Sequence, residues 1–71
     1  MKTEYDSFYF VKDEDVKDRW NCFDSGTRLE LGQVHLYKIG WVFLPDFRRP
    51  VMTLSELRDI TDFMSQLEKK K

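Results

Sequence analysis

Two segments in the N-terminal half of the chain have strand-like patterns of apolar residues. Residues 5–12 are rich in aromatic and β-branched side chains, and neither face of an extended segment there would be polar. This pattern favours a strand that is covered on both sides. Residues 27–31 alternate polar and apolar positions, which is typical of a half-buried strand.

The segment between these two stretches favours a short helix. Val16, Trp20 and Phe23 recur at helical spacing, and acidic residues precede them, where they suit the positive end of a helix dipole. A glycine at position 26 could cap the end of such a helix in a left-handed conformation. The sequence therefore predicts a helix from Asp15 to Phe23.

Residues 34–44 carry the strongest hairpin pattern in the chain. A two-residue turn at Ile39-Gly40 would force β-branched Ile39 to a positive φ, whereas a three-residue loop needs only Gly40 to be left-handed. We therefore expect the loop to be Lys38-Ile39-Gly40.

This register assigns the hairpin side chains to two unlike faces, because successive residues of a strand point to opposite sides. One face is aliphatic: Val34, Leu36, Val42 and Leu44. The other is aromatic and includes one imidazole: His35, Tyr37, Trp41 and Phe43.

A longer helix is predicted at the C-terminal end. Two prolines, Pro45 and Pro50, indicate a loop after the hairpin. Thr53 and Glu56 then match a capping box, and an apolar stripe follows at helical spacing: Leu54, Leu57, Ile60, Met64 and Leu67.

These elements together predict one compact α+β domain over residues 1–71. We expect a small antiparallel sheet of three to four strands, a short helix in the N-terminal half, and a longer amphipathic C-terminal helix packed on one face of the sheet. A chain of 71 residues suits a single domain.

Charge and cysteine content narrow the function classes. The formal net charge of -1 excludes the strongly basic composition of a dedicated nucleic-acid binder. One Cys and one His cannot by themselves form a disulfide or complete a zinc site, so we expect no cofactor and no metal. The acidic N-terminal residues and the lack of a long apolar run predict a cytoplasmic chain with no membrane partner.

Catalytic patterns are also lacking in the sequence. The acidic residues between 13 and 24 do not match a calcium loop, because Asp18 occupies the position that requires glycine. Cys22 fits a buried apolar position, and His35 fits a packed or partly exposed strand residue, with no nucleophile motif beside either of them. We therefore expect the protein not to be an enzyme.

The aromatic face of the hairpin leads to the main functional hypothesis. Tyr, Trp and Phe are common interface anchors, so His35, Tyr37, Trp41 and Phe43 are candidate contacts for another protein or for a second copy of the chain. In a competing interpretation, the N-terminal half folds over this face. The sequence leaves both open.

Nucleic-acid binding or transcriptional regulation is the alternative function. Phe47, Arg48 and Arg49 beside an aromatic sheet face offer the combination of stacking and positive charge that single strands need. Few phosphate contacts would result, so this alternative ranks second.

Overall fold

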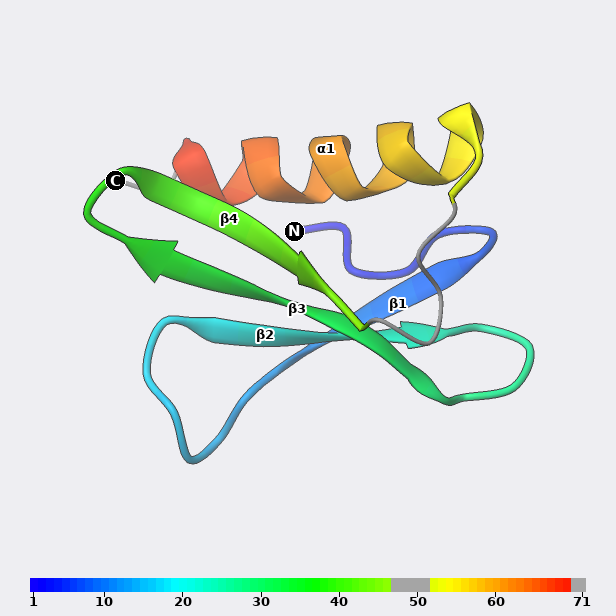
Figure 1. The fold of residues 1–71 in the computed structure, drawn as a ribbon, viewed down its shortest axis with the longest axis horizontal. Helices are drawn as coiled ribbons and strands as arrows, with labels where there is room; N and C mark the ends of the chain where they lie inside the picture. Colours follow the sequence, from blue (N-terminus) through cyan, green and yellow to red (C-terminus); the bar gives the residue numbers. More distant parts are fainter. Residues whose placement is uncertain (47–51, 70–71) are drawn as a thin grey trace.

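The fold is a two-layer α+β arrangement in which one helix covers one face of an antiparallel sheet (Figure 1). The computed structural model describes residues 1–46 and 52–69. Each strand pairs with the next one in the sequence, so the spatial order is β1-β2-β3-β4. The elements are β1 (Phe8–Lys12), β2 (Arg19–Asp24), β3 (Glu30–Tyr37), β4 (Gly40–Pro45) and α1 (Leu54–Glu68). The predicted α+β class, antiparallel sheet and C-terminal helix are confirmed.

The core lies between α1 and the sheet. The Phe63 ring of α1 stacks on Phe10 of β1 at 3.9 Å between ring centroids and meets the edge of Trp20 at 5.2 Å. Burial of a large apolar side chain contributes roughly 1.5–3 kcal/mol to the stability of the fold, so these rings account for much of the stabilisation between the helix and the sheet. The buried apolar residues are Phe8, Phe10, Cys22, Leu31, Val34, Ile60, Phe63 and Leu67.

Helix α1 begins with the predicted capping box. The Glu56 amide donates to Thr53 Oγ1 at 3.1 Å, and the Thr53 amide donates to Glu56 Oε1 at 2.9 Å. The predicted apolar stripe is partly wrong, because Leu54 and Leu57 are 65% and 48% exposed. The buried line of the helix instead includes Phe63, which lies one position from the predicted Met64.

The predicted helix from Asp15 to Phe23 does not form, and strand β2 takes most of its place. Asp13 Oδ1 accepts the amides of Asp15 and Val16, both at 2.8 Å, which closes a tight turn after β1. Asp18 then adopts a positive φ of 58°. Side chains that bind nearby amides compete with helix formation, and here the turn held by Asp13 forms in place of the first turn of a helix.

The residues after β2 form another turn rather than a helix end. Asp24 Oδ1 accepts the amides of Gly26 and Thr27, at 2.7 and 2.9 Å. The residue with a positive φ is Arg28, at 64°, and not Gly26. The expected glycine cap is therefore wrong as well.

The β3–β4 hairpin forms with a register one residue away from the predicted one. Tyr37 pairs with Gly40, so the loop contains only Lys38 and Ile39. Gly40 has a φ of 120°, which confirms its expected positive φ. Because Gly40 adopts this conformation as the first residue of β4, the two loop residues keep a negative φ.

This one-residue difference moves every β4 side chain to the opposite face of the sheet. Val34 pairs with Phe43, and Leu36 pairs with Trp41, so both aromatic rings lie on the side of α1. The predicted aliphatic and aromatic faces therefore do not exist as such: each face of the hairpin is mixed.

The N-terminal residues cover the free edge of β1. The Phe10 amide donates to the Thr3 carbonyl at 2.9 Å, and the Tyr5 amide donates to the Phe8 carbonyl at 2.7 Å. The Tyr5 hydroxyl donates to Asp62 of α1 at 2.6 Å. Burial of the phenol and the adjacent Asp62 carboxylate raise the pKa of Tyr5 above its usual range, so the hydroxyl keeps the proton that it donates.

No helix in the described ranges is long and apolar enough to cross a membrane.

Candidate functional site

The face of the sheet that points away from α1, here called the outer face, has no layer over it in the described part of the chain. The strand registers place alternate residues on this face, with polar side chains in the middle and apolar ones towards both edges. These residues are Tyr9, Val11, Arg19, Asn21, Phe23, Glu30, Gln33, His35, Tyr37, Val42 and Leu44.

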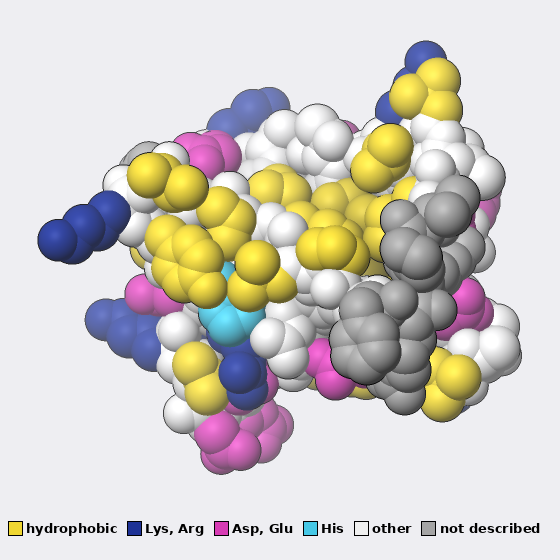
Figure 2. Space-filling view, viewed as in Figure 1, with side chains coloured by type: hydrophobic (Ala, Val, Ile, Leu, Met, Phe, Trp, Pro, Cys, Tyr) yellow, Lys and Arg dark blue, Asp and Glu magenta, His cyan; other side chains and the backbone are white. Residues whose placement is uncertain are grey.

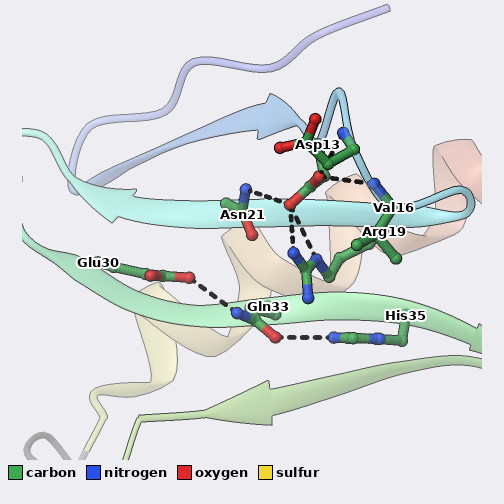
Figure 3. Close-up of polar contacts among 8 residues, drawn as sticks. Asp13, Val16, Arg19, Asn21, Glu30, Gln33 and His35 are labelled. Atoms are coloured by element: carbon green, nitrogen blue, oxygen red, sulfur yellow. Dashed lines mark hydrogen bonds and ion pairs between the residues drawn. The ribbon is translucent and has the colours of Figure 1, made fainter.

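One polar cluster on the outer face is centred on Asp13 (Figure 3). Asp13 Oδ2 accepts from Arg19 Nη2 at 2.6 Å, from Arg19 Nε at 2.9 Å and from Asn21 Nδ2 at 3.2 Å. The Arg19 hydrogen bond, followed by the Val16 amide, holds the pKa of Asp13 well below its usual range. The positive charge of the Arg19 guanidinium is therefore balanced by the Asp13 carboxylate.

A second polar chain runs along β3 (Figure 3). Gln33 Nε2 donates to Glu30 Oε2 at 3.1 Å, so the amide oxygen of Gln33 faces His35 Nε2, 2.8 Å away. An amide oxygen only accepts hydrogen bonds, so His35 Nε2 is the donor in this contact. The imidazole is thereby fixed as part of a strand surface, as the sequence predicts.

The structure separates the four residues of the predicted aromatic site. His35 and Tyr37 lie on the outer face, with ring centroids 5.9 Å apart. Trp41 and Phe43 lie on the opposite side, partly buried against the core. The prediction that these four residues share one face is wrong, because it depended on the three-residue loop. Their role in binding stays a prediction.

The other sequence-based candidates are placed as follows. Phe47, Arg48 and Arg49 lie outside the described residues. Cys22 is fully buried on the α1 side of β2, which confirms its expected position as a small apolar residue. Within residues 1–46 and 52–69, no group of three His, Cys, Asp or Glu side chains could hold a metal ion.

The β3–β4 hairpin carries several exposed apolar side chains. Ile39 is 87% exposed and Tyr37 is 49% exposed, and Figure 2 shows apolar side chains gathered on the face that carries β4. We define the hairpin surface as six exposed or half-buried apolar residues from both sides of the hairpin. Tyr37, Val42 and Leu44 lie on the outer face, Leu36 and Trp41 lie on the α1 side, and Ile39 lies in the loop.

Sequence reasoning missed Val42 and Leu44 as surface residues. The signal that could have found them is the composition of β4, whose sequence GWVFLP contains no polar side chain. A strand without polar residues is normally buried, yet no residue of β4 is fully buried. Strand β4 is thus more apolar than an ordinary edge strand.

Comparisons with protein-family models, with curated proteins and with solved structures find no match for this chain.

Proposed function

We propose that the protein is a non-enzymatic, cytoplasmic protein-binding module that contacts its partner through the hairpin surface. The observation that carries this proposal is the exposure of apolar side chains on one hairpin, among them Ile39, Tyr37 and Leu44. Contiguous apolar patches are rare on the surfaces of monomers and are common in interfaces. The exposed pair on α1, Leu54 and Leu57, is smaller and lies beside the charged Arg58 and Asp62.

The chemistry of the outer face supports binding rather than catalysis. His35 is held by Gln33, and the Cys22 thiol is buried on the other side of the sheet. A nucleophile that substrate cannot reach does not support a covalent mechanism.

The same face gives little support to the nucleic-acid alternative. Arg19 is bonded to Asp13, and the Tyr9 ring already stacks on Phe23 with centroids 5.3 Å apart. Neither group offers the free cation or the free ring that single strands require. This alternative therefore depends on the other sheet aromatics, such as the exposed Tyr37, and on Phe47, Arg48 and Arg49, which lie outside the described residues.

Site-specific photo-crosslinking tests the proposed function. A photoreactive residue replaces Ile39, which is 87% exposed, or replaces Val16 as a control in the loop between β1 and β2. In a lysate of the native host, we expect Ile39 to crosslink protein and Val16 not to do so, with the same result after nuclease treatment. Crosslinks to nucleic acid that disappear in the Arg48→Ala/Arg49→Ala variant would instead favour the alternative.

A further inference from the structure

The two edges of the sheet differ in how they are covered. The N-terminal residues pair with β1, as the hydrogen bond from the Phe10 amide to the Thr3 carbonyl shows. No described residue adds a strand beyond β4. An edge strand presents amide and carbonyl groups to which another strand can bind.

The hydrogen bonds of β4 show which of its backbone groups point outward. In an antiparallel pair, alternate residues bond to the neighbouring strand and the residues between them point away from it. The Asp46 amide donates to the Leu31 carbonyl at 2.7 Å, so even-numbered residues face β3. The Trp41 amide agrees with this alternation, because it points away from β3 and donates to Glu68 Oε1. Residues 41, 43 and 45 therefore face outward.

These three outward positions are symmetric about Phe43, and this symmetry suits pairing with an identical strand. If a two-fold axis passes beside Phe43, its amide and carbonyl bond to those of the same residue in the second copy. Trp41 then lies opposite Pro45 of the second copy. Pro45 has no amide hydrogen, but its carbonyl can accept from the Trp41 amide. The pairing thus provides four backbone hydrogen bonds.

Side chains and charge also fit this register. On the outer face, Val42 lies opposite Leu44 of the second copy, and both residues are apolar. β4 carries no charged side chain, so the β4 residues that lie opposite each other in this pairing bring no like charges together. In the single chain the Trp41 amide donates a long hydrogen bond of 3.4 Å to Glu68 Oε1. In the dimer, a bond to the Pro45 carbonyl of the second copy must replace it.

From these observations we infer that the partner of β4 is a second copy of this chain, paired antiparallel along β4 to form a continuous eight-stranded sheet. The inference rests on the proposed function, because β4 forms part of the hairpin surface. The two-fold axis is perpendicular to the shared sheet, so the α1 helices of both copies lie on the same face.

Sedimentation of the full chain from micromolar to millimolar concentration tests this inference. We expect a monomer–dimer equilibrium that Leu44→Lys weakens roughly tenfold or more, because a lysine would lose water opposite Val42 of the second copy. Leu44 is 40% exposed, so the substitution does not disturb the core. Val11→Lys is the matched control, since Val11 is 46% exposed on the outer face of β1, at the other edge of the sheet.

The register can be tested separately. A mixture of the Leu44→Lys variant and the Val42→Glu variant is expected to restore association. The introduced lysine and glutamate lie opposite each other only in the proposed pairing. An isotope-filtered NMR spectrum should also show a contact between the Val42 Hα of one copy and the Leu44 Hα of the other.

A chain that stays monomeric at millimolar concentration overturns the inference, and so does association that Leu44→Lys leaves unchanged. If the monomeric chain still crosslinks another protein through Ile39, the second copy is wrong as the partner and the binding function stands. If it neither associates nor crosslinks protein, both proposals fail.

Discussion

At the residue scale, Asp13 determines the course of the chain between β1 and β2. One oxygen of its carboxylate accepts two loop amides, and the other accepts from Arg19 and Asn21 of β2. Each of these bonds favours the ionised carboxylate, which lowers the pKa of Asp13. The sequence shows the acid but not its partners, and this is why the local pattern suggested the first turn of a helix.

This arrangement predicts how stability depends on pH. The pKa of Asp13 is lowered in the folded state, so the unfolded chain, with a value of about 3.9, binds the proton more readily. The stabilisation by Asp13 is present above about pH 4 and is lost as the pH falls towards the lower folded-state pKa. Urea unfolding at a series of acidic pH values should show that Asp13→Asn reduces this loss. Equal pH dependence in both proteins would contradict the role of Asp13.

Gly32 is a second residue whose identity is set by its surroundings. A Cβ atom at this position would lie 2.7 Å from the Leu44 carbonyl oxygen and 2.8 Å from the Phe43 ring. Because the first of these atoms belongs to the backbone of β4, the neighbouring strand would have to move.

Gly32→Ala should therefore destabilise the protein by roughly 1–3 kcal/mol, the usual cost of overpacking. Gly26→Ala is the matched control, because its nearest atom would be Asp24 Oδ1 at 3.2 Å. The two variants are to be compared by their urea midpoints. If Gly26→Ala costs as much as Gly32→Ala, the close approach of β4 is not the reason for the glycine.

At the element scale, sequence reasoning succeeded where the structure is locally determined. The capping box of α1 needs only Thr53 and Glu56, three residues apart, and both of its hydrogen bonds form as predicted. The hairpin was also found from its local pattern. Its register was not, because a positive φ at Gly40 is compatible both with a three-residue loop and with the observed two-residue loop.

The N-terminal helix failed for a related reason. Trp20 and Phe23 are three residues apart, a spacing that would place them on the same face of a helix. On a strand, the same spacing places them on opposite faces of the sheet. Trp20 packs against Phe63 of α1, and Phe23 stacks on Tyr9 of the outer face. Contacts between distant segments decided between these alternatives, and they are not visible in a local pattern.

The observed register gives two hairpin residues unequal roles in the core. Trp41 packs against the core, whereas Leu36 is 38% exposed. Trp41→Ser should therefore destabilise the protein by about 2 kcal/mol or more, and Leu36→Ala should cost clearly less. Thermal and urea unfolding of both variants will check this. A larger loss for Leu36→Ala would support the three-residue loop and the separate aromatic face.

At the scale of the whole molecule, the protein protects one edge of its sheet and leaves the other apolar. The N-terminal residues cover β1 and are held to α1 by Gln66, whose side chain bonds both the amide and the carbonyl of Lys2, at 2.8 and 2.9 Å. β4 instead presents outward-facing backbone groups and only apolar side chains. This asymmetry is the physical basis for the proposal that the hairpin contacts a partner.

The exchange rate of the Phe43 amide tests this account most directly. This amide points away from β3, whereas the Val42 amide points towards it, so of these two amides only that of Phe43 gains a hydrogen bond when another strand binds. Hydrogen exchange followed by NMR at increasing concentrations of the chain should show protection rising at Phe43 and unchanged at Val42. If Phe43 exchanges at the same rate at every concentration and in the presence of any protein crosslinked through Ile39, β4 is not a binding edge.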